Sequence, residues 1–234
     1  MSILSKLLAL VSQRNPQVHS EGAEGAARLS RLGQLFTVNW KQNLLLAGRC
    51  FGVHSGTLSA GADVALITGG GAGTVIDSDQ PELAVGIPAG YYMIPLEFHA
   101  SLQVDVDLDA EVANVLLFAD RTAQIPAPVI ASSVLFTPYN LLDGGPESIA
   151  RAQGTVSTDI TDPVMDELLM FETLREADVT AAGSVIAKLS AHYEPQIPSI
   201  LKGPCSVIGC WGGTAAAAAM ARFVWAEIPA NWVE

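Results

Sequence analysis

The sequence predicts an all-β fold in which antiparallel strands form a sandwich or a barrel. Short runs rich in β-branched and aromatic residues recur along the chain, and turns that contain Gly and Pro separate them. We count about eight to ten such runs, a number and spacing typical of sandwiches and barrels. Strands and helices do not alternate in the manner of a parallel α/β sheet. A chain of 234 residues is long enough for one large all-β domain.

The N-terminal segment is predicted to be a short amphipathic helix. Its apolar residues recur at helical spacing; they are Ile3, Leu4, Leu7, Leu8 and Val11. Because a bilayer span needs ~20 apolar residues, we expect the helix to pack on the domain, on a neighbouring subunit or on a membrane surface. Residues 15–33 are polar with interspersed Gly and Ala, and are interpreted as an arm. The predicted organisation is a helix and arm over 1–33 and a single β domain over 34–234.

The first half of the β domain contains the strongest strand signal, which lies in residues 91–106. There Ile94, Leu96 and Phe98 are expected on one face of a strand, with Glu97 and His99 on the other. Residues 36–43 and 44–54 are predicted to form one or two strands, and the remaining strands predicted in this half are 64–68, 83–88, 112–119 and 128–136.

The second half begins with a connecting loop in which residues 147–151 are predicted to form a short helix, after the turn at 143–146. Residues 166–175 suit either a helix or a strand. We favour a strand because residues 185–193, which follow after a turn, would pair with it.

The C-terminal part is interpreted as two antiparallel strands, over residues 205–211 and 216–228, joined by a glycine-rich connection. Gly203-Pro204 marks the entry to the first strand, and Pro229 marks the exit from the second. A chain that finishes on a strand usually pairs that strand within a sheet, so this pair is expected to belong to the core of the domain.

Composition and charge restrict the partners of the protein. Half of the residues are apolar and 15% are charged. A surface with so few charged residues is typical of a subunit that buries part of its exterior in an assembly. Abundant Ala and Gly also raise the apolar count, which is the alternative interpretation. The net charge is −12, which argues against direct binding to nucleic acid, because phosphate backbones are bound by clustered Lys and Arg.

The three cysteines, Cys50, Cys205 and Cys210, form no disulfide framework. Cys205 and Cys210 stand five positions apart in one predicted strand, so their side chains point to opposite faces. We therefore expect buried free thiols and folding in a reducing compartment.

No set of residues indicates catalysis, and the protein is not expected to be an enzyme. The histidines, His19, His54, His99 and His192, are scattered, and none belongs to a motif that places two imidazoles on one metal. They are interpreted as surface or hydrogen-bonded strand residues.

The acidic run 105–111 has carboxylates at alternate positions, beginning with Asp105. Such carboxylates repel one another unless water or a cation intervenes, and a calcium ion at a subunit boundary is one interpretation. The run lacks the Gly and the bidentate Glu of an EF-hand loop, and we favour a solvated strand end without a cofactor.

Several segments resemble virion jelly-roll proteins of uncultured phages. The motifs PQIP (195–198), KGP (202–204) and FVWAEIP (223–229) resemble the C-terminal strands of those proteins, and VHSGTL (53–58) and IPAGYYMIPL (87–96) are similar to their early strands. The resemblance implies a jelly roll of eight antiparallel strands in two sheets. It further implies a capsid subunit that is made in the host cytoplasm, is located in the virion and assembles symmetrically with copies of itself. It transfers no catalytic residue.

Subunit or membrane contacts are expected from Ile3, Leu4, Leu7 and Leu8 of the N-terminal helix and from Trp211 and Trp225 near the C-terminus. Further partners would be other capsid proteins or an internal lipid layer facing the helix, with a separate basic protein handling the genome. The alternative function is a carbohydrate-binding or ligand-binding sandwich without catalysis. Exposed aromatic residues clustered in loops would favour that alternative, and only 6% of the residues are aromatic.

Overall fold

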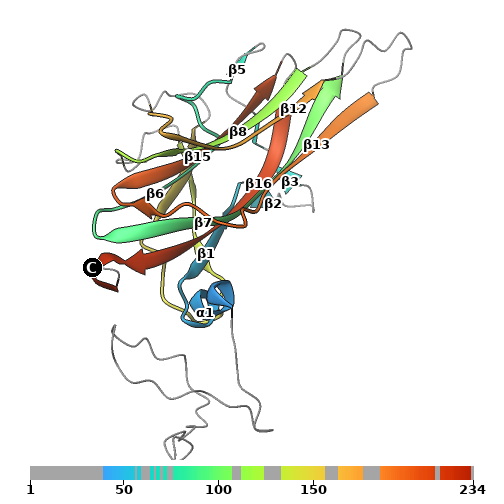
Figure 1. Cartoon of the computed structure of the whole chain (residues 1–234). Helices are drawn as coiled ribbons and strands as arrows, with labels where there is room; N and C mark the ends of the chain where they lie inside the picture. The colour runs from blue at the N-terminus through green and yellow to red at the C-terminus, as the bar shows by residue number, and fades with distance from the viewer. Residues whose placement is uncertain are drawn as a thin grey trace, which may run out of the picture.

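The chain is described by a computed structural model in which two mainly antiparallel sheets pack face to face, with a short helix at one end (Figure 1). The all-β sandwich predicted from the sequence is confirmed. The structure describes residues 39–55, 57–58, 64–65, 67–68, 71–72, 76–106, 112–123, 133–155, 163–175, 185–213 and 217–232. The N-terminal segment 1–33 lies outside these residues.

Sheet 1 has the strand order β10-β1-β16-β7-β13, with β14 paired to β7 and β4 paired to β16. Its strands are β1 (Cys50–His54), β4 (Ile67–Thr68), β7 (Tyr91–Val106), β10 (Tyr139–Asn140), β13 (Val185–Tyr193), β14 (Leu201–Lys202) and β16 (Ala217–Pro229). A 3₁₀ turn, Ala230–Trp232, follows β16.

Sheet 2 has the order β12-β8-β15-β6-β11-β9, and β5 pairs with β15 in the parallel sense. Its strands are β5 (Gly71–Ala72), β6 (Leu83–Ile87), β8 (Val112–Asp120), β9 (Ser133–Phe136), β11 (Arg151–Thr155), β12 (Glu167–Arg175) and β15 (Cys205–Gly213). A separate small ribbon pairs β2 (Thr57–Leu58) with β3 (Val64–Ala65). The predicted strands 83–88, 91–106 and 166–175 thus match β6, β7 and β12.

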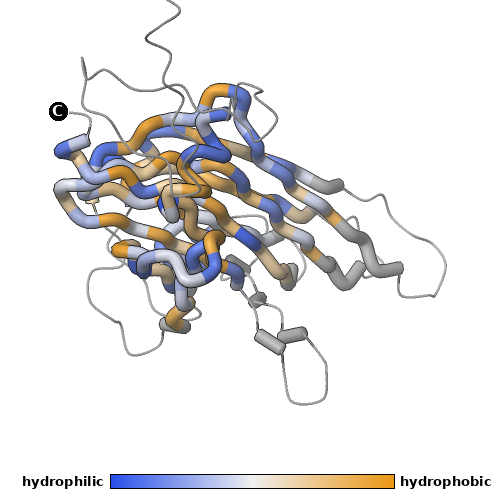
Figure 2. Tube along the Cα trace, turned by 90° about the horizontal axis from the view of Figure 1, so that it is seen from below, coloured by the Kyte–Doolittle hydropathy of each residue, from blue (hydrophilic) through white to orange (hydrophobic). Residues whose placement is uncertain are grey.

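The core lies between the two sheets and is centred on large aromatic side chains. The Trp225 ring stacks on Phe223 with 5.4 Å between ring centroids, and Phe51 approaches it from β1 at 6.3 Å. Trp211 on β15 belongs to the same cluster. Hydrophobic and hydrophilic residues alternate along the strands, as a two-sheet core requires (Figure 2).

Each sheet also carries a smaller apolar cluster on its outer face. On sheet 1, buried residues of β1, β7 and β16 pack under Leu44 and Leu45 of helix α1 (Trp40–Leu46). On sheet 2, Phe118 of β8 and Ile208 of β15 pack with Ile76 and Ala123. The sandwich therefore has three apolar layers, of which only the central one lies between the sheets.

Helix α1 occupies residues for which the sequence pattern predicted strand, namely part of 36–43 and the start of 44–54, while residues 36–38 lie outside the described residues. The side chain of Asn39 accepts a hydrogen bond from the Gln42 N–H at 2.8 Å and caps the first turn. At the other end Gly48 adopts a φ of 66°, and the Arg49 N–H donates to the Leu44 carbonyl. These two caps, together with leucines that pack on sheet 1, stabilise seven residues as a helix.

A β-bulge in β7 changes which of its side chains face the core. Val224 lies opposite Glu97 while Trp225 lies opposite Pro95, so Leu96 is an extra residue on β7. As a result Leu96 belongs to the outer cluster under α1, whereas Phe98 belongs to the central core. The prediction that Ile94, Leu96 and Phe98 share one face is therefore wrong, because a bulge shifts the alternation by one position.

Two predicted pairings between consecutive strands are not found, because the strands of each pair lie in different sheets. The C-terminal strands β15 and β16 belong to sheets 2 and 1 and do not form the expected pair. Likewise β12 pairs with β8 and β13 pairs with β7, so the predicted pairing of 166–175 with 185–193 is wrong. Each connection crosses from one sheet to the other, a long-range arrangement that local patterns do not specify.

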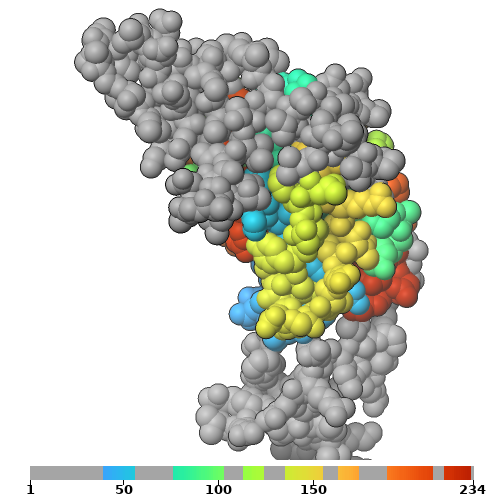
Figure 3. All heavy atoms as spheres, turned by 180° about the vertical axis from the view of Figure 1, so that it is seen from behind, coloured from blue at the N-terminus to red at the C-terminus, as the bar shows by residue number. Residues whose placement is uncertain are grey.

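The predicted short helix at 147–151 is also absent from the structure, and extended chain leads into β11 there. Buried Glu227 holds this segment by accepting hydrogen bonds from the Ser148 hydroxyl and the Ile149 N–H, as well as from the Trp225 indole. Residues 133–155 run from the edge of sheet 2 at β9 to the edge of sheet 1 at β10 and return to sheet 2 at β11, and they cover one side of the molecule (yellow in Figure 3).

Candidate interaction surfaces

The two tryptophans that the sequence suggested as interface residues lie in the core of the chain. Trp211 and Trp225 are both 0% exposed, and the Trp225 indole N–H is satisfied by Glu227 at 2.9 Å. Their side chains therefore do not reach a neighbouring subunit, because the core uses the largest apolar surfaces available. The other four predicted interface residues, Ile3, Leu4, Leu7 and Leu8, lie outside the described residues.

A surface patch of exposed apolar side chains gathers around the start of strand β12. We call it the β12 patch; each of its six members is more than half exposed, and they are Val164, Met165, Leu168, Phe171, Ile197 and Ile200. Leu168 lies opposite Phe118, and Phe171 lies opposite Leu116, a neighbour of the outer cluster of sheet 2. Leu168 and Phe171 therefore lie on the exposed continuation of this outer apolar layer.

Polar contacts fix the two chain segments of the β12 patch against each other. The Ser199 hydroxyl donates to Glu167, the first residue of β12, and Arg121 forms an ion pair with the same carboxylate. Burial tends to raise the pKa of Glu167, but the hydrogen bonds from Ser199 and Arg121 outweigh it and lower the pKa below its ordinary value. Ile197 and Ile200 are thereby anchored beside β12.

Asp120 organises the turn beneath the β12 patch. One carboxylate oxygen accepts hydrogen bonds from Thr122 and Ala123, and the other accepts from the Val164 N–H at 2.9 Å. Burial tends to raise the pKa of Asp120, but these donors prevail and lower it below its ordinary value. The charged form of this buried side chain thus holds Val164 in place.

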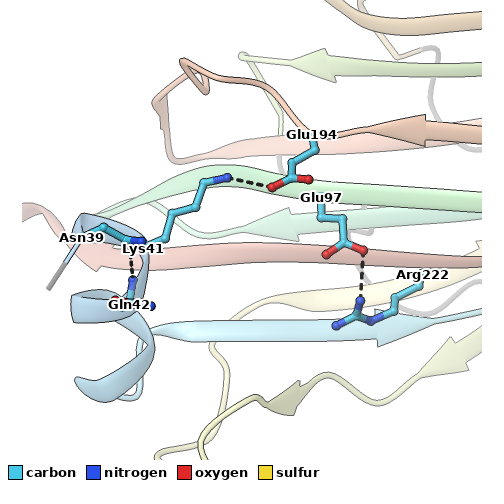
Figure 4. A network of polar contacts seen from close by, with 6 residues as sticks. All are labelled: Asn39, Lys41, Gln42, Glu97, Glu194 and Arg222. Atoms are coloured by element: carbon cyan, nitrogen blue, oxygen red, sulfur yellow. Dashed lines mark hydrogen bonds and ion pairs between the residues drawn. The ribbon is translucent and has the colours of Figure 1, made fainter.

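A groove of about 190 Å³ lies between helix α1 and the outer face of sheet 1. Lys41 reaches from α1 to Glu194 at 3.3 Å, and Arg222 pairs with Glu97 at 3.1 Å on the sheet below (Figure 4). The groove is lined by Lys41, Gln42, Leu45, Cys50, Leu96, Glu97, Leu141, Glu194 and Val224. Ligand pockets usually measure ~300–1,000 Å³, so this groove suits a single apolar side chain better than a small molecule.

The histidines are less scattered in the fold than in the sequence. His54, His99 and His192 lie in one row across sheet 1, because the register places His54 and His99 on either side of Arg222 and places His192 opposite His99. The sequence contains no local signal for this row, since its members come from three strands far apart in the chain.

The cysteines are free and buried, as predicted. Burial raises the pKa of Cys50 to about 11 and that of Cys205 to about 12, and it raises the pKa of Cys210 well above its ordinary value. None of the three is a reactive thiolate at neutral pH.

The acidic run cannot be placed as a site. Most of it, residues 107–111, lies outside the described part of the chain. Among the residues that the structure describes, no three His, Cys, Asp or Glu side chains gather as metal ligands, and no helix there is long and apolar enough to span a membrane.

Comparison with models of protein families, with curated proteins and with solved structures gave no match.

Proposed function

We propose that the sandwich is a jelly roll and that the chain is the subunit of a self-assembling virion shell. The observation that carries the proposal is the strand order. When the eight main strands are numbered along the chain, sheet 1 reads first, eighth, third, sixth, and sheet 2 reads second, seventh, fourth, fifth; in chain order these strands are β1, β6, β7, β8, β12, β13, β15 and β16.

This order follows from wrapping one long antiparallel hairpin around the core. The first strand pairs with the eighth, the second with the seventh, the third with the sixth and the fourth with the fifth. Double-sheet jelly rolls have this construction, and they occur in viral capsid proteins, lectins and cupins. The strand order therefore supports a jelly roll, and the surfaces described above favour a capsid subunit among the proteins built on that fold.

The β12 patch favours assembly over a monomeric binding module. Fully burying an exposed Leu, Ile, Met or Phe side chain contributes about 1.5–3 kcal/mol, so six half-exposed side chains offer roughly 5–9 kcal/mol before the costs of association. Contiguous exposed apolar patches commonly mark protein interfaces. The small groove beside α1 offers no comparable support for the alternative, a carbohydrate-binding or ligand-binding sandwich.

The proposal is tested by the native mass of the purified full-length protein, measured by light scattering and followed by negative-stain electron microscopy over a range of protein and salt concentrations. We expect symmetric oligomers or closed shells. The double variant Leu168→Asp with Phe171→Asp should raise the protein concentration needed for assembly at least tenfold, because it places charge within the β12 patch.

Leu135→Asp is the matched control, because Leu135 is 60% exposed on β9 at the opposite edge of sheet 2. Loss of assembly in the double variant, with assembly retained in Leu135→Asp, supports the β12 patch as the contact between subunits. A monomer under all conditions contradicts the shell proposal, and binding of that monomer on a glycan array would favour the alternative function.

The N-terminal helix is proposed to contact a neighbouring subunit, another capsid protein or an internal lipid layer. Flotation of the full-length protein with liposomes tests the lipid contact, with the variant Leu7→Glu, Leu8→Glu as the control. Flotation that the variant abolishes supports the lipid layer, whereas failure of both proteins to float leaves protein contacts as the role of the helix.

A further inference from the structure

The row of histidines on sheet 1 lies on the outer face of the sandwich. Residues next to each member point into the central core, among them Val53, Phe98 and Phe223, and side chains alternate between faces along a strand. His54, Arg222, His99 and His192 thus face outward in one line across four strands. This arrangement depends only on the described fold, and it stands whether or not the protein forms a shell.

His99 and His192 are direct cross-strand neighbours with a spacing that suits a shared metal ion. Their ring centroids are 6.2 Å apart and their planes are inclined by 62°. A zinc–nitrogen bond of ~2.0–2.1 Å places each ring centroid about 3 Å from the ion, so two imidazoles on one ion have centroids about 5–6 Å apart. The observed separation of the His99 and His192 rings is close to this range.

Ser190 provides the outer hydrogen bond that metal-binding histidines usually have. Its hydroxyl oxygen lies 3.1 Å from Nε2 of His99. When that Nε2–H donates to Ser190, the lone pair of the imidazole remains on Nδ1, where a metal binds. Ser190 stands two positions before His192 on β13, so the same strand supplies the partner residue and the second imidazole.

The charges around the pair are arranged so that a cation is tolerated. The neighbouring cation is Arg222 on β16, and its guanidinium is directed to Glu97 at 3.1 Å and to the Tyr139 hydroxyl at 3.4 Å. Glu194, beyond the end of β13, pairs with Lys41 of α1. The net charge of −12 adds a general attraction for cations.

We propose that His99 and His192 form a binding site for one divalent transition-metal ion of the zinc, nickel and copper class, with water completing the coordination. Imidazole nitrogen suits these ions, whereas calcium and magnesium require oxygen ligands. With two protein ligands the site binds more weakly than four-ligand structural zinc sites. A bound ion links β7 to β13, the edge strand of sheet 1.

The test is calorimetric titration of the purified full-length protein with nickel and with zinc chloride, after treatment with a chelator. We expect one ion per chain, and each of the variants His99→Gln and His192→Gln should weaken binding at least tenfold. His54→Gln is the matched control, because His54 lies in the same row but is separated from the pair by Arg222. It should bind like the original protein.

Folding of each variant is checked by its thermal unfolding midpoint in chelator, which should be unchanged because none of these side chains belongs to the core. The metal should raise the midpoint of the original protein and of His54→Gln only. Absence of binding at metal concentrations up to about 1 mM, equal binding by all variants, or equal loss in His54→Gln would each overturn the proposal.

Discussion

Gln153 is a polar side chain that the fold buries without a hydrogen-bond partner in the described part of the chain. It is 0% exposed on β11, between Ala84 of β6 and Leu135 of β9, and neither its amide nitrogen nor its amide oxygen has a hydrogen-bond partner among the described residues. A buried unsatisfied polar group costs about 1–3 kcal/mol. At this position the fold therefore forgoes stability that an apolar residue of similar length would supply.

We predict that Gln153→Met stabilises the protein by about 1–2 kcal/mol, because it removes the unsatisfied amide while keeping the side-chain volume. Urea unfolding monitored by tryptophan fluorescence measures the change. Gln153→Glu is the control and should destabilise the fold, since it introduces a buried charge. A lower unfolding midpoint for Gln153→Met would show that the amide has a partner in solution.

Asp120 is predicted to make the fold sensitive to acid. Its pKa is lowered in the folded chain, so its carboxylate contributes stability above the ordinary pKa near 3.8, and this contribution is lost as the pH falls through the lowered value. The free energy of unfolding should therefore decrease from about pH 5 downward. Asp120→Asn should show a smaller decrease over the same window; an identical pH dependence of the two proteins would contradict the role of Asp120.

At the scale of elements, the connection between β14 and β15 leaves no room for a side chain at Gly203. A Cβ atom on Gly203 would lie 2.1 Å from the Pro88 carbonyl oxygen and 3.1 Å from that of Tyr91. The Gly203 N–H donates to the same Tyr91 carbonyl at 2.8 Å. Because the obstructing atoms are backbone, they cannot move unless the connection between β6 and β7 moves away from β14.

We predict that Gly203→Ala destabilises the protein by about 3 kcal/mol or more, as overpacking against backbone does. Gly209→Ala on β15 is the control, because the nearest atom to its Cβ would be a Phe98 side-chain carbon at 3.4 Å, and its cost should be smaller. Chemical unfolding of both variants measures the difference. Equal free energies of unfolding for the two variants would mean that the backbone around Gly203 moves to accommodate the Cβ atom without loss of stability.

Local patterns predicted the strands far better than they predicted the pairing of those strands. The long period-two run of β7 was found with its correct ends, and β6, β12 and β13 were also found. Helix α1 was missed although Asn39 and Gly48 are ordinary cap residues, because the apolar residues between them also suit a strand. The bulge at Leu96 and the row of histidines depend on register between distant strands, which the local sequence does not contain.

At the scale of the whole molecule, the apolar surface is divided among a central core, two outer clusters and the β12 patch. Strand alternation predicted that a core lies between two sheets, but it did not assign the aromatic residues, because Trp211 and Trp225 were expected at contacts and lie in the central core. The β12 patch was not predicted, although residues 168–171 are apolar at every position. That pattern indicates a strand with apolar groups on both faces, and the structure shows that one of these faces is exposed.

The thiols provide a probe of the whole fold, because all three are buried and each belongs to a different apolar cluster. We predict that a thiolate-specific disulfide reagent at pH near 8 leaves the folded protein unmodified and labels three thiols per chain in denaturant. The labelling rate at intermediate denaturant should follow global unfolding. Rapid labelling of one thiol in the folded protein would reveal local opening of its cluster.

The position of β16 has a consequence for the synthesis of the chain. This strand lies between β1 and β7 in sheet 1, and it pairs with both along their lengths. Strand β1, the first of the described strands to be made, therefore lacks its partner β16 in sheet 1 until translation has passed Pro229. Folding is then expected to begin with pairs made earlier in the chain, such as β8 with β12 and β7 with β13, and to be completed once β16 is available. During that interval β1 keeps an unpaired edge, and chaperones that shield such edges would improve the yield of folded protein.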